Sequence, residues 1–292
     1  MKLHYSTNFG EAYWAKTQDF LESSIAIELA GKVDLILTSP PYPLAAPKAY
    51  GNKNGEEYRS EILEIFMKAI PLLSETGSLV VEIGNAWEKG LPEMQTLPVE
   101  TLLSIKNELN LVLCQMFIWD NPNKMPGPAS WVNIKRIRVK DSFTHIWWFA
   151  KTPFPKADNR NVLAPYKTGM EKLLETQKYN RGTRPSGHEV GDGFLVRNEG
   201  AIPSSVLRFS NSKESAEYKA WCENHGLTRH PARMPADLAK FFINLTTTEG
   251  DLVFDPFGGS NTTGRASEDL GRRWIITEMS EKYIEGSRGR FQ

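Results

Sequence analysis

The sequence predicts an α/β fold, in which a parallel sheet is covered by helices and an irregular lobe is inserted into the chain. Two observations carry this prediction. Short apolar runs alternate with segments of helical periodicity in residues 1–150 and again in 226–292. Between them, residues 151–225 are rich in Pro, Asn, Gly and Ser, and their apolar runs are short. We therefore expect one sheet built from two halves of the chain.

The first half predicts strands and helices in alternation. "VDLIL" (33–37) is a short apolar run typical of a buried strand, and residues 56–77 follow helical spacing up to a glycine. A helix at 98–110 and strands at 78–83, 111–119 and 143–150 complete this half.

The second half repeats the alternation. It predicts a helix at 235–247, a strand at 251–254, a Gly-rich turn, a helix at 262–271, a strand at 272–277 and a last helix.

Composition bounds the class of protein. With 292 residues, 40% of them hydrophobic, the chain can bury a sizeable core. No apolar run of 18 residues exists and the first residues lack a signal core, so neither a membrane span nor secretion is expected. Two cysteines, Cys114 and Cys222, make no disulfide framework or metal site. We expect a soluble, cytoplasmic protein without a metal.

The charges are balanced in number but segregated along the chain. The totals are 35 basic and 35 acidic residues, yet residues 121–213 carry 16 Lys and Arg against 7 Asp and Glu, a net charge of +9. A basic middle inside an acidic frame favours a polyanionic partner. An unevenly charged, solvated surface would give the same numbers.

A Gly-rich turn suggests a cofactor site. "DLVFDPFGGSNTTGRASEDLG" (251–271) reads as strand, turn and helix, and Gly258 and Gly259 permit tight geometry and close approach of a ligand. Glu278 ends the next strand, 23 residues after Asp255, where a carboxylate can accept ribose hydroxyls. No G-x-G-x-x-G is present, so an adenosine-bearing cofactor without a pyrophosphate fits. A plain βα turn remains the alternative.

The stretch "LILTSPPYPL" (35–44) ends an apolar strand in a serine, two prolines and a tyrosine. Together, "TSPPY" and "DPFGGSNTTG" resemble the signature motifs of the DNA amino-methyltransferases, which use S-adenosylmethionine. The catalytic motif comes first and the cofactor motif last, as in the permuted β group of that family. Serine at the first tetrad position is typical of enzymes that methylate cytosine N4. "KRIRVKDSFTHIWWFAKT", "VLAPY", "RPSGH" and "HPARMPADL" extend the resemblance over nearly the whole chain.

The resemblance implies a Rossmann-like methyltransferase sheet, with a catalytic half at 1–150, a target-recognition region at 151–225 and a cofactor-binding half at 226–292. It implies N4 methylation of a cytosine flipped out of double-stranded DNA, within a restriction–modification system that includes a cognate endonuclease. The residues that it assigns to the cofactor are Asp255, Pro256, Phe257, Gly258, Gly259, Ser260, Thr262, Glu278 and Pro235. Two positions depart from the family pattern: Asn261 replaces a common glycine, and Lys16 replaces an early aspartate.

The tetrad suits this chemistry. An exocyclic amino nitrogen is a poor nucleophile because its lone pair is delocalised into the ring, so attack on a sulfonium methyl needs acceptors for its two N–H bonds. The Ser39 hydroxyl and the Pro40 carbonyl can accept them, Pro41 stiffens the loop, and Tyr42 can stack on a flipped base. Glu82 ends a neighbouring strand and could accept a proton or orient the amino group; a structural carboxylate would explain it equally well.

Polar residues after other strands are further candidates. Asp120 and Asn123 could line the base pocket, or belong to an ordinary loop. A basic run, expected on a strand and suited to phosphate contact, consists of Lys135, Arg136, Arg138 and Lys140.

Two alternatives stay open. An adenine-N6 methyltransferase uses the same chemistry, and a methyltransferase-like DNA-binding module could have lost catalysis. A cytosine C5 enzyme fits poorly, because it needs a thiolate nucleophile, usually in a Pro-Cys pair, whereas Cys114 follows leucine and Cys222 follows tryptophan.

Overall fold

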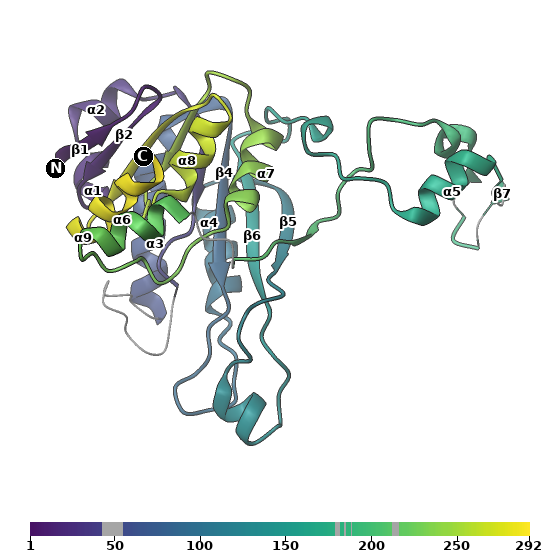
Figure 1. The fold of residues 1–292 in the computed structure, drawn as a ribbon, viewed down its shortest axis with the longest axis horizontal. Helices are drawn as coiled ribbons and strands as arrows, with labels where there is room; N and C mark the ends of the chain where they lie inside the picture. The colour runs from purple at the N-terminus through teal and green to yellow at the C-terminus, as the bar shows by residue number, and fades with distance from the viewer. Residues whose placement is uncertain (43–54, 179–181, 184, 188, 212–215) are drawn as a thin grey trace. The chain divides into compact units, whose positions relative to one another are not determined.

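Nine strands form one twisted sheet in a computed structural model of the chain (Figure 1). The structure describes residues 1–42, 55–178, 182–183, 185–187, 189–211 and 216–292. The strand order is β1-β2-β11-β10-β3-β4-β6-β5-β9. In chain order the strands are β1 (Lys2–Ser6), β2 (Gly10–Trp14), β3 (Val33–Thr38), β4 (Leu73–Gly84), β5 (Val112–Asp120), β6 (Phe143–Ala150), β9 (Val206–Arg208), β10 (Leu252–Asp255) and β11 (Arg273–Glu278).

The middle of the sheet is parallel, as the sequence predicts. β2, β11, β10, β3 and β4 run parallel to one another, whereas β1 is antiparallel to β2 and β6 lies antiparallel between β4 and β5. β10 and β3 are adjacent, but the chain leaves them in opposite directions, toward β11 and toward β4. Such a reversal of strand order opens a crevice at the carboxyl ends of the two strands.

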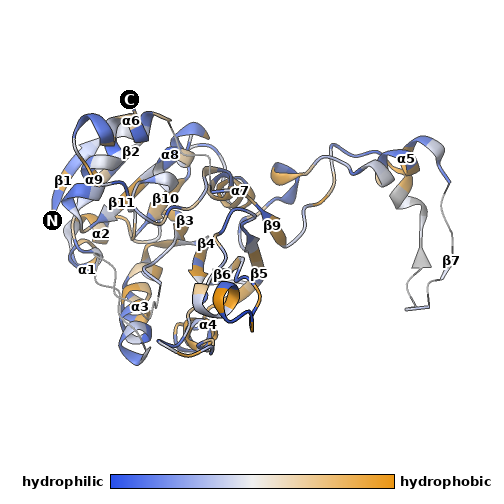
Figure 2. Cartoon of the chain, turned by 60° about the horizontal axis from the view of Figure 1, so that its bottom comes forward, coloured by the Kyte–Doolittle hydropathy of each residue, from blue (hydrophilic) through white to orange (hydrophobic). Residues whose placement is uncertain are grey.

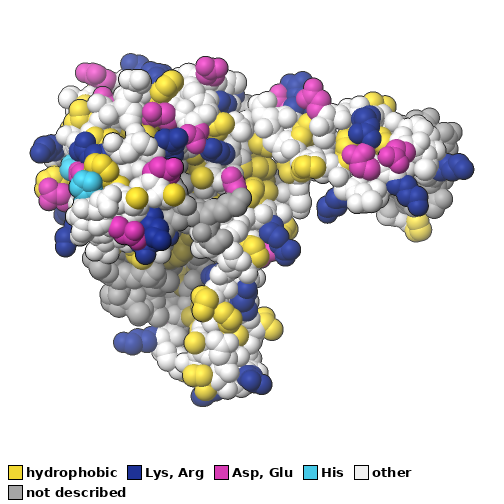
Figure 3. All heavy atoms as spheres, viewed as in Figure 1, with side chains coloured by type: hydrophobic (Ala, Val, Ile, Leu, Met, Phe, Trp, Pro, Cys, Tyr) yellow, Lys and Arg dark blue, Asp and Glu magenta, His cyan; other side chains and the backbone are white. Residues whose placement is uncertain are grey.

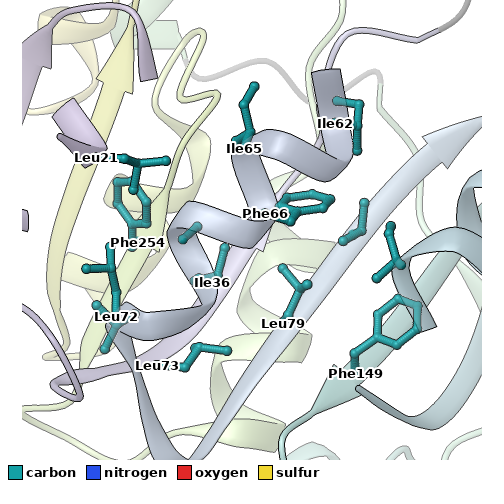
Figure 4. Close-up of a cluster of buried hydrophobic side chains, with 14 of the residues drawn as sticks. Leu21, Ile36, Ile62, Ile65, Phe66, Leu72, Leu73, Leu79, Phe149 and Phe254 are labelled. Atoms are coloured by element: carbon teal, nitrogen blue, oxygen red, sulfur yellow. The ribbon is translucent and has the colours of Figure 1, made fainter. Parts of the chain in front are cut away.

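Helices cover both faces of the sheet. On one face, α1 (Thr17–Leu21), α2 (Ser24–Glu28), α3 (Gly55–Ala69) and α4 (Leu97–Glu108) bury their apolar sides against the strands. Figure 4 shows Phe66 of α3 over Leu79 of β4, and Ile65, Ile36 and Phe254 belong to the same buried cluster. Figure 2 shows that hydrophobic and hydrophilic residues alternate along these helices, as expected for helices with one buried side.

The other face carries α7 (Ala236–Thr246), α8 (Thr262–Asp269) and α9 (Glu281–Ser287). Phe242 of α7 packs edge-on against Phe117 of β5, and Ile284 of α9 packs with Ile276 of β11. Ile275, the preceding residue of β11, packs in the cluster on the other face. Successive residues of this strand therefore contribute to the two helical layers in turn. The remaining helical segments of this unit are α6 (Ala216–Asn224), η1 (Ile70–Leu72), η2 (Ser130–Ile134) and η5 (Arg288–Arg290).

A second compact unit comprises Asp158–Ser204, and the sheet belongs to the first unit, Met1–Ala157 with Ser205–Gln292. The second unit is shorter than the expected region 151–225, because β9 and α6 belong to the first unit. It contains η3 (Asn159–Val162), α5 (Thr168–Thr176), β7 (Gly182–Thr183), β8 (Glu189–Val190) and η4 (Asp192–Leu195). Arg184 and His188, at the ends of "RPSGH", lie outside the described residues.

The predicted helix at 56–77 is too long. It ends at Ala69, η1 follows, and β4 begins at Leu73 rather than at 78. Pro71 accounts for the difference, because proline has no N–H and its ring clashes with the preceding turn of a helix interior. Residues 1–32, for which no element was predicted, form β1, β2, α1 and α2. Among the described residues, no helix is long and apolar enough to span a membrane.

Candidate active site

A cavity of about 400 Å³ opens at the carboxyl ends of β3, β10 and β11. Its walls include the tetrad Ser39–Tyr42, the turn from Asp255 to Ser260, and Glu278. The two motifs therefore meet at one site, in the crevice where the strand order reverses.

Glu82 joins the tetrad through two hydrogen bonds. The β3–β4 register pairs Thr38 with Val81, which brings Ser39 level with Glu82. Ser39 Oγ donates to one carboxylate oxygen of Glu82 at 2.5 Å, and the Tyr42 hydroxyl donates to the other. Burial raises the pKa of Glu82, and the bonds from Ser39 and Tyr42 oppose part of that rise. A buried carboxylate thus holds both functional side chains of the tetrad.

The ring of Tyr42 lies against β4 at Gly84. A Cβ at Gly84 would come within 2.6 Å of the ring, so only glycine leaves room for it. Burial and the charge of Glu82 raise the pKa of Tyr42, so its hydroxyl stays protonated and remains a donor.

The Asp255 carboxylate is engaged inside the protein. It accepts hydrogen bonds from Thr38 Oγ1 at 2.8 Å, from Thr263 Oγ1 at 2.7 Å and from the backbone N–H of Phe257 at 3.0 Å. Burial raises its pKa against these three bonds. Because Thr38 immediately precedes the tetrad, Asp255 ties the catalytic strand to the Gly-rich turn.

The two glycines of the turn have different roles. A Cβ at Gly258 would lie 2.6 Å from Cδ1 of Ile276, so the close approach at this position is to β11. Gly259 has a φ of +52°, which side chains rarely adopt. Its N–H donates to Glu278 at 2.9 Å.

The conformation and contacts of Asn261 account for asparagine in place of the common glycine. It has a φ of 55°, in the left-handed region that asparagine tolerates better than most residues. Its side chain accepts from the N–H of Gly264 at 2.9 Å and so caps α8, while its Nδ2 donates to the Tyr5 hydroxyl at 2.9 Å. Asparagine thus meets the conformational demand of a glycine and also satisfies a helix terminus.

Glu278 lies on the wall of the cavity. Its carboxylate accepts from the N–H groups of Gly259 at 2.9 Å and Ser280 at 2.7 Å, and its side chain is 9% exposed. Burial raises its pKa to about 7. Each carboxylate oxygen has further lone pairs, so the group can still accept a ligand hydroxyl.

The cavity wall also includes residues for which no role was predicted from the sequence. Lys16 lines it, as does Thr17, whose hydroxyl donates to the Pro256 carbonyl and lies 3.0 Å from that of Thr277. Pro235 precedes α7 as its N-cap, while the wall itself includes the neighbouring residues 232–234. Only the folded position of the first 20 residues, against β11, brings Thr17 to this site.

The basic run is not a strand, so that expectation was wrong. Lys135 ends the π-helix η2, and Arg136 has a φ of 54°. Arg138 donates to the Pro92 carbonyl at 2.9 Å and Lys140 to the Pro122 carbonyl at 3.3 Å, whereas Lys135 lies 4.7 Å from the Trp131 ring. These contacts tie the β5–β6 connection to itself and, through Pro92, to the segment before α4, and the side chain of Arg136 remains exposed.

Nearly half of the basic excess belongs to this connection. Residues 121–142 carry 5 Lys and Arg against 1 Asp, which is four of the nine net charges. Lys151 and Lys156, after β6, add two more, and residues 158–204 are nearly balanced. Figure 3 shows Lys, Arg and hydrophobic side chains side by side on the part of the surface that this connection forms.

Asp120 and Asn123 do not line the cavity. Asp120 accepts from Arg208 Nε at 2.8 Å, and Asn123 Nδ2 donates to Ser210 Oγ at 2.7 Å. Their contacts hold β9 and the residues after it to the end of β5, and these contacts account for both side chains structurally.

Comparisons with known proteins agree with this arrangement. A family model described as DNA methylase matches residues 33–288. The type II methyltransferase M.PvuII of Proteus hauseri is 41% identical over 289 residues, which cover 98% of this chain and 85% of that protein.

Solved structures extend the likeness to the fold. The PvuII DNA methyltransferase (cytosine-N4-specific) superposes with a TM-score of 0.81 and 36% identity, covering all of this chain and 89% of that one. The M1.HpyAVI–SAM complex, with a TM-score of 0.59 and 19% identity, covers 97% of this chain and 99% of that one and shares the fold.

Proposed function

Because this chain belongs to the DNA methylase family, we propose that it transfers a methyl group from S-adenosylmethionine to the exocyclic N4 of a cytosine flipped out of double-stranded DNA. The observation that carries the proposal is the Ser39–Glu82–Tyr42 cluster beside the Gly-rich turn. Serine at the first tetrad position favours cytosine N4 over adenine N6.

The cavity fits the cofactor. Its volume of about 400 Å³ suits a molecule of that size, and the Gly258–Ser260 backbone and Glu278 line it together. Glu278 would accept the ribose hydroxyls, and the Gly-rich turn would hold the rest of the molecule at the end of β10. When bound, the cofactor supplies an electrophilic methyl group on a sulfonium.

The residues of the tetrad would prepare the amino group. Ser39 Oγ donates its hydrogen bond to Glu82, so its lone pairs are available to accept one N4–H bond, and the Pro40 carbonyl accepts the other. This withdraws the nitrogen lone pair from the ring. As the N4–carbon bond forms, one N4 proton must leave, and a buried carboxylate of raised pKa, reached through Ser39, is suited to receive it.

The DNA would meet two parts of the chain. We assign phosphate contact to the basic connection around Arg136, and target recognition to the region 151–225. A cognate restriction endonuclease is the proposed functional partner, and the cytoplasm the proposed location.

Nucleoside analysis of DNA modified by the purified protein tests the reaction. We expect N4-methylcytosine from the wild-type chain and far less of it from Ser39→Ala in the same reaction time. N6-methyladenine in the product would show that the target base is adenine and not cytosine. Cofactor binding without any modified base would favour an inactive DNA-binding module.

A further inference from the structure

Tyr58 presents a polar group that the tetrad mechanism does not use. It lies in the first turns of α3, and its side chain is 2% exposed within the apolar cluster that contains Ile62 and Phe66. Nevertheless, its hydroxyl finds no hydrogen-bond partner among the residues that the structure describes. A buried, unpaired hydroxyl is costly, and such exceptions in a folded protein call for a reason.

The position of Tyr58 supplies the reason. The residue is part of the cavity wall that also includes Ser39, Pro40 and Tyr42. Burial raises the pKa of Tyr58, and the charges of Glu82 and Glu61 raise it further. The phenol therefore keeps its proton and stands close to the carboxylate that organises the tetrad, which makes it a donor at the catalytic end of the cavity.

We propose that the Tyr58 hydroxyl donates a hydrogen bond to the Watson–Crick edge of the flipped cytosine, at the ring nitrogen N3 beside the reacting amino group. This rests on the proposed function of the tetrad. Ser39 and Pro40 offer acceptors to the amino group, so a neighbouring donor completes the pattern that a cytosine edge presents. The cofactor is a poorer fit, because its ribose contact, Glu278, belongs to β11 and not to the tetrad.

The chain offers a matched pair of variants. Tyr58→Phe removes a hydroxyl without a protein partner, whereas Tyr13→Phe removes one that donates to Glu11 at 2.5 Å. Both rings belong to the same apolar cluster, and Tyr13 is not part of the cavity wall. Removing a hydroxyl that bonds within the protein lowers the stability of the fold. Removing a hydroxyl that is reserved for a ligand does not.

The experiment measures both variants on duplex DNA that contains the target site, mapped first from the wild-type product. Tyr58→Phe is expected to lower kcat/KM for DNA about tenfold, the size of one hydrogen bond, with an unchanged Kd for S-adenosylmethionine and an equal or higher Tm. Tyr13→Phe is expected to keep full activity and to lower the Tm.

A substrate analogue identifies the acceptor. In 3-deazacytosine a C–H replaces N3, so the tenfold difference between wild type and Tyr58→Phe should vanish on that substrate. A loss of equal size on both substrates, a weakened Kd for the cofactor, or full activity with a lowered Tm would each overturn the proposal. If the wild type makes N4-methylcytosine and Tyr58→Phe matches it, only this inference fails; if the wild type makes none, the proposed function fails first.

Discussion

At the scale of single residues, Glu82 organises the site. One buried carboxylate holds Ser39 and Tyr42 by separate oxygens, so the two side chains cannot move independently. Removing either hydroxyl tests a different part of the proposed reaction.

Ser39→Ala removes an acceptor that matters most when N4 becomes tetrahedral. We expect the single-turnover methylation rate to fall about 100-fold or more, while affinities for cofactor and DNA change little, since the loss falls on the transition state. Tyr42→Phe, which keeps the ring beside Gly84, should retain most of the rate, whereas Tyr42→Ala should lose stacking of about 1–3 kcal/mol. A fully active Ser39→Ala protein would refute the role of the tetrad.

Glu278 should make cofactor binding depend on pH. In the folded protein the pKa of Glu278 is about 7, above its usual value of 4.5. The folded state therefore loses stability as the pH rises from 4.5 to about 7, because the group ionises more readily in the unfolded chain. Ribose hydroxyls donate hydrogen bonds to the ionised carboxylate. Affinity for the cofactor should therefore increase as pH rises, whereas folding stability decreases.

Titration calorimetry between pH 6 and pH 8 should show the Kd of the cofactor falling about tenfold, as the ionised fraction of a group of pKa 7 increases. Glu278→Gln should bind more weakly and lose this dependence. A pH-independent Kd in the wild type would place the ribose elsewhere.

At the scale of elements, the turn between β10 and α8 depends on Asn261. This residue takes the left-handed conformation and caps the helix with the same side chain. The two roles can be separated by substitution.

Asn261→Ala loses the cap and retains the strained φ, so the free energy of unfolding in urea should fall by about 1.5–4 kcal/mol. Asn261→Gly loses the cap, but glycine adopts the left-handed conformation without strain, so its free energy of unfolding should fall by less. Equal effects of the two substitutions would argue against conformational strain at this position.

At the scale of the whole molecule, zero net charge conceals a basic connection between β5 and β6. Within it, Arg136 is exposed and Arg138 is bonded to the backbone of the segment before α4. Their contributions to DNA binding should therefore differ in kind.

Arg136→Ala should weaken DNA binding and reduce the slope of log K against log salt by about one, alike for all sequences. Arg138→Ala should also lower stability, because it releases the Pro92 carbonyl. Lys240→Ala removes a positive charge paired with Asp269 and serves as the control, with an unchanged slope. Salt titrations by fluorescence anisotropy would measure all three, and an unaltered slope for Arg136→Ala would show that the connection is merely solvated.

The sequence by itself determined the alternation of strands and helices, because their periodicity is written in neighbouring residues. It also determined the two motifs, since Ser-Pro-Pro-Tyr and the Gly-rich turn are contiguous. β3, β6 and α7 lie within one residue of their predicted limits for that reason.

Only the tertiary structure decided which side chains meet. The β3–β4 register places Ser39 beside Glu82, the crevice joins Thr38 to Asp255, and the packing of α3 buries Tyr58 at the cavity without a partner. These pairings connect positions up to some 217 residues apart, and no local pattern encodes them. Register and packing arise from the burial of whole faces, so the site's donors and acceptors become known only when the sheet is assembled.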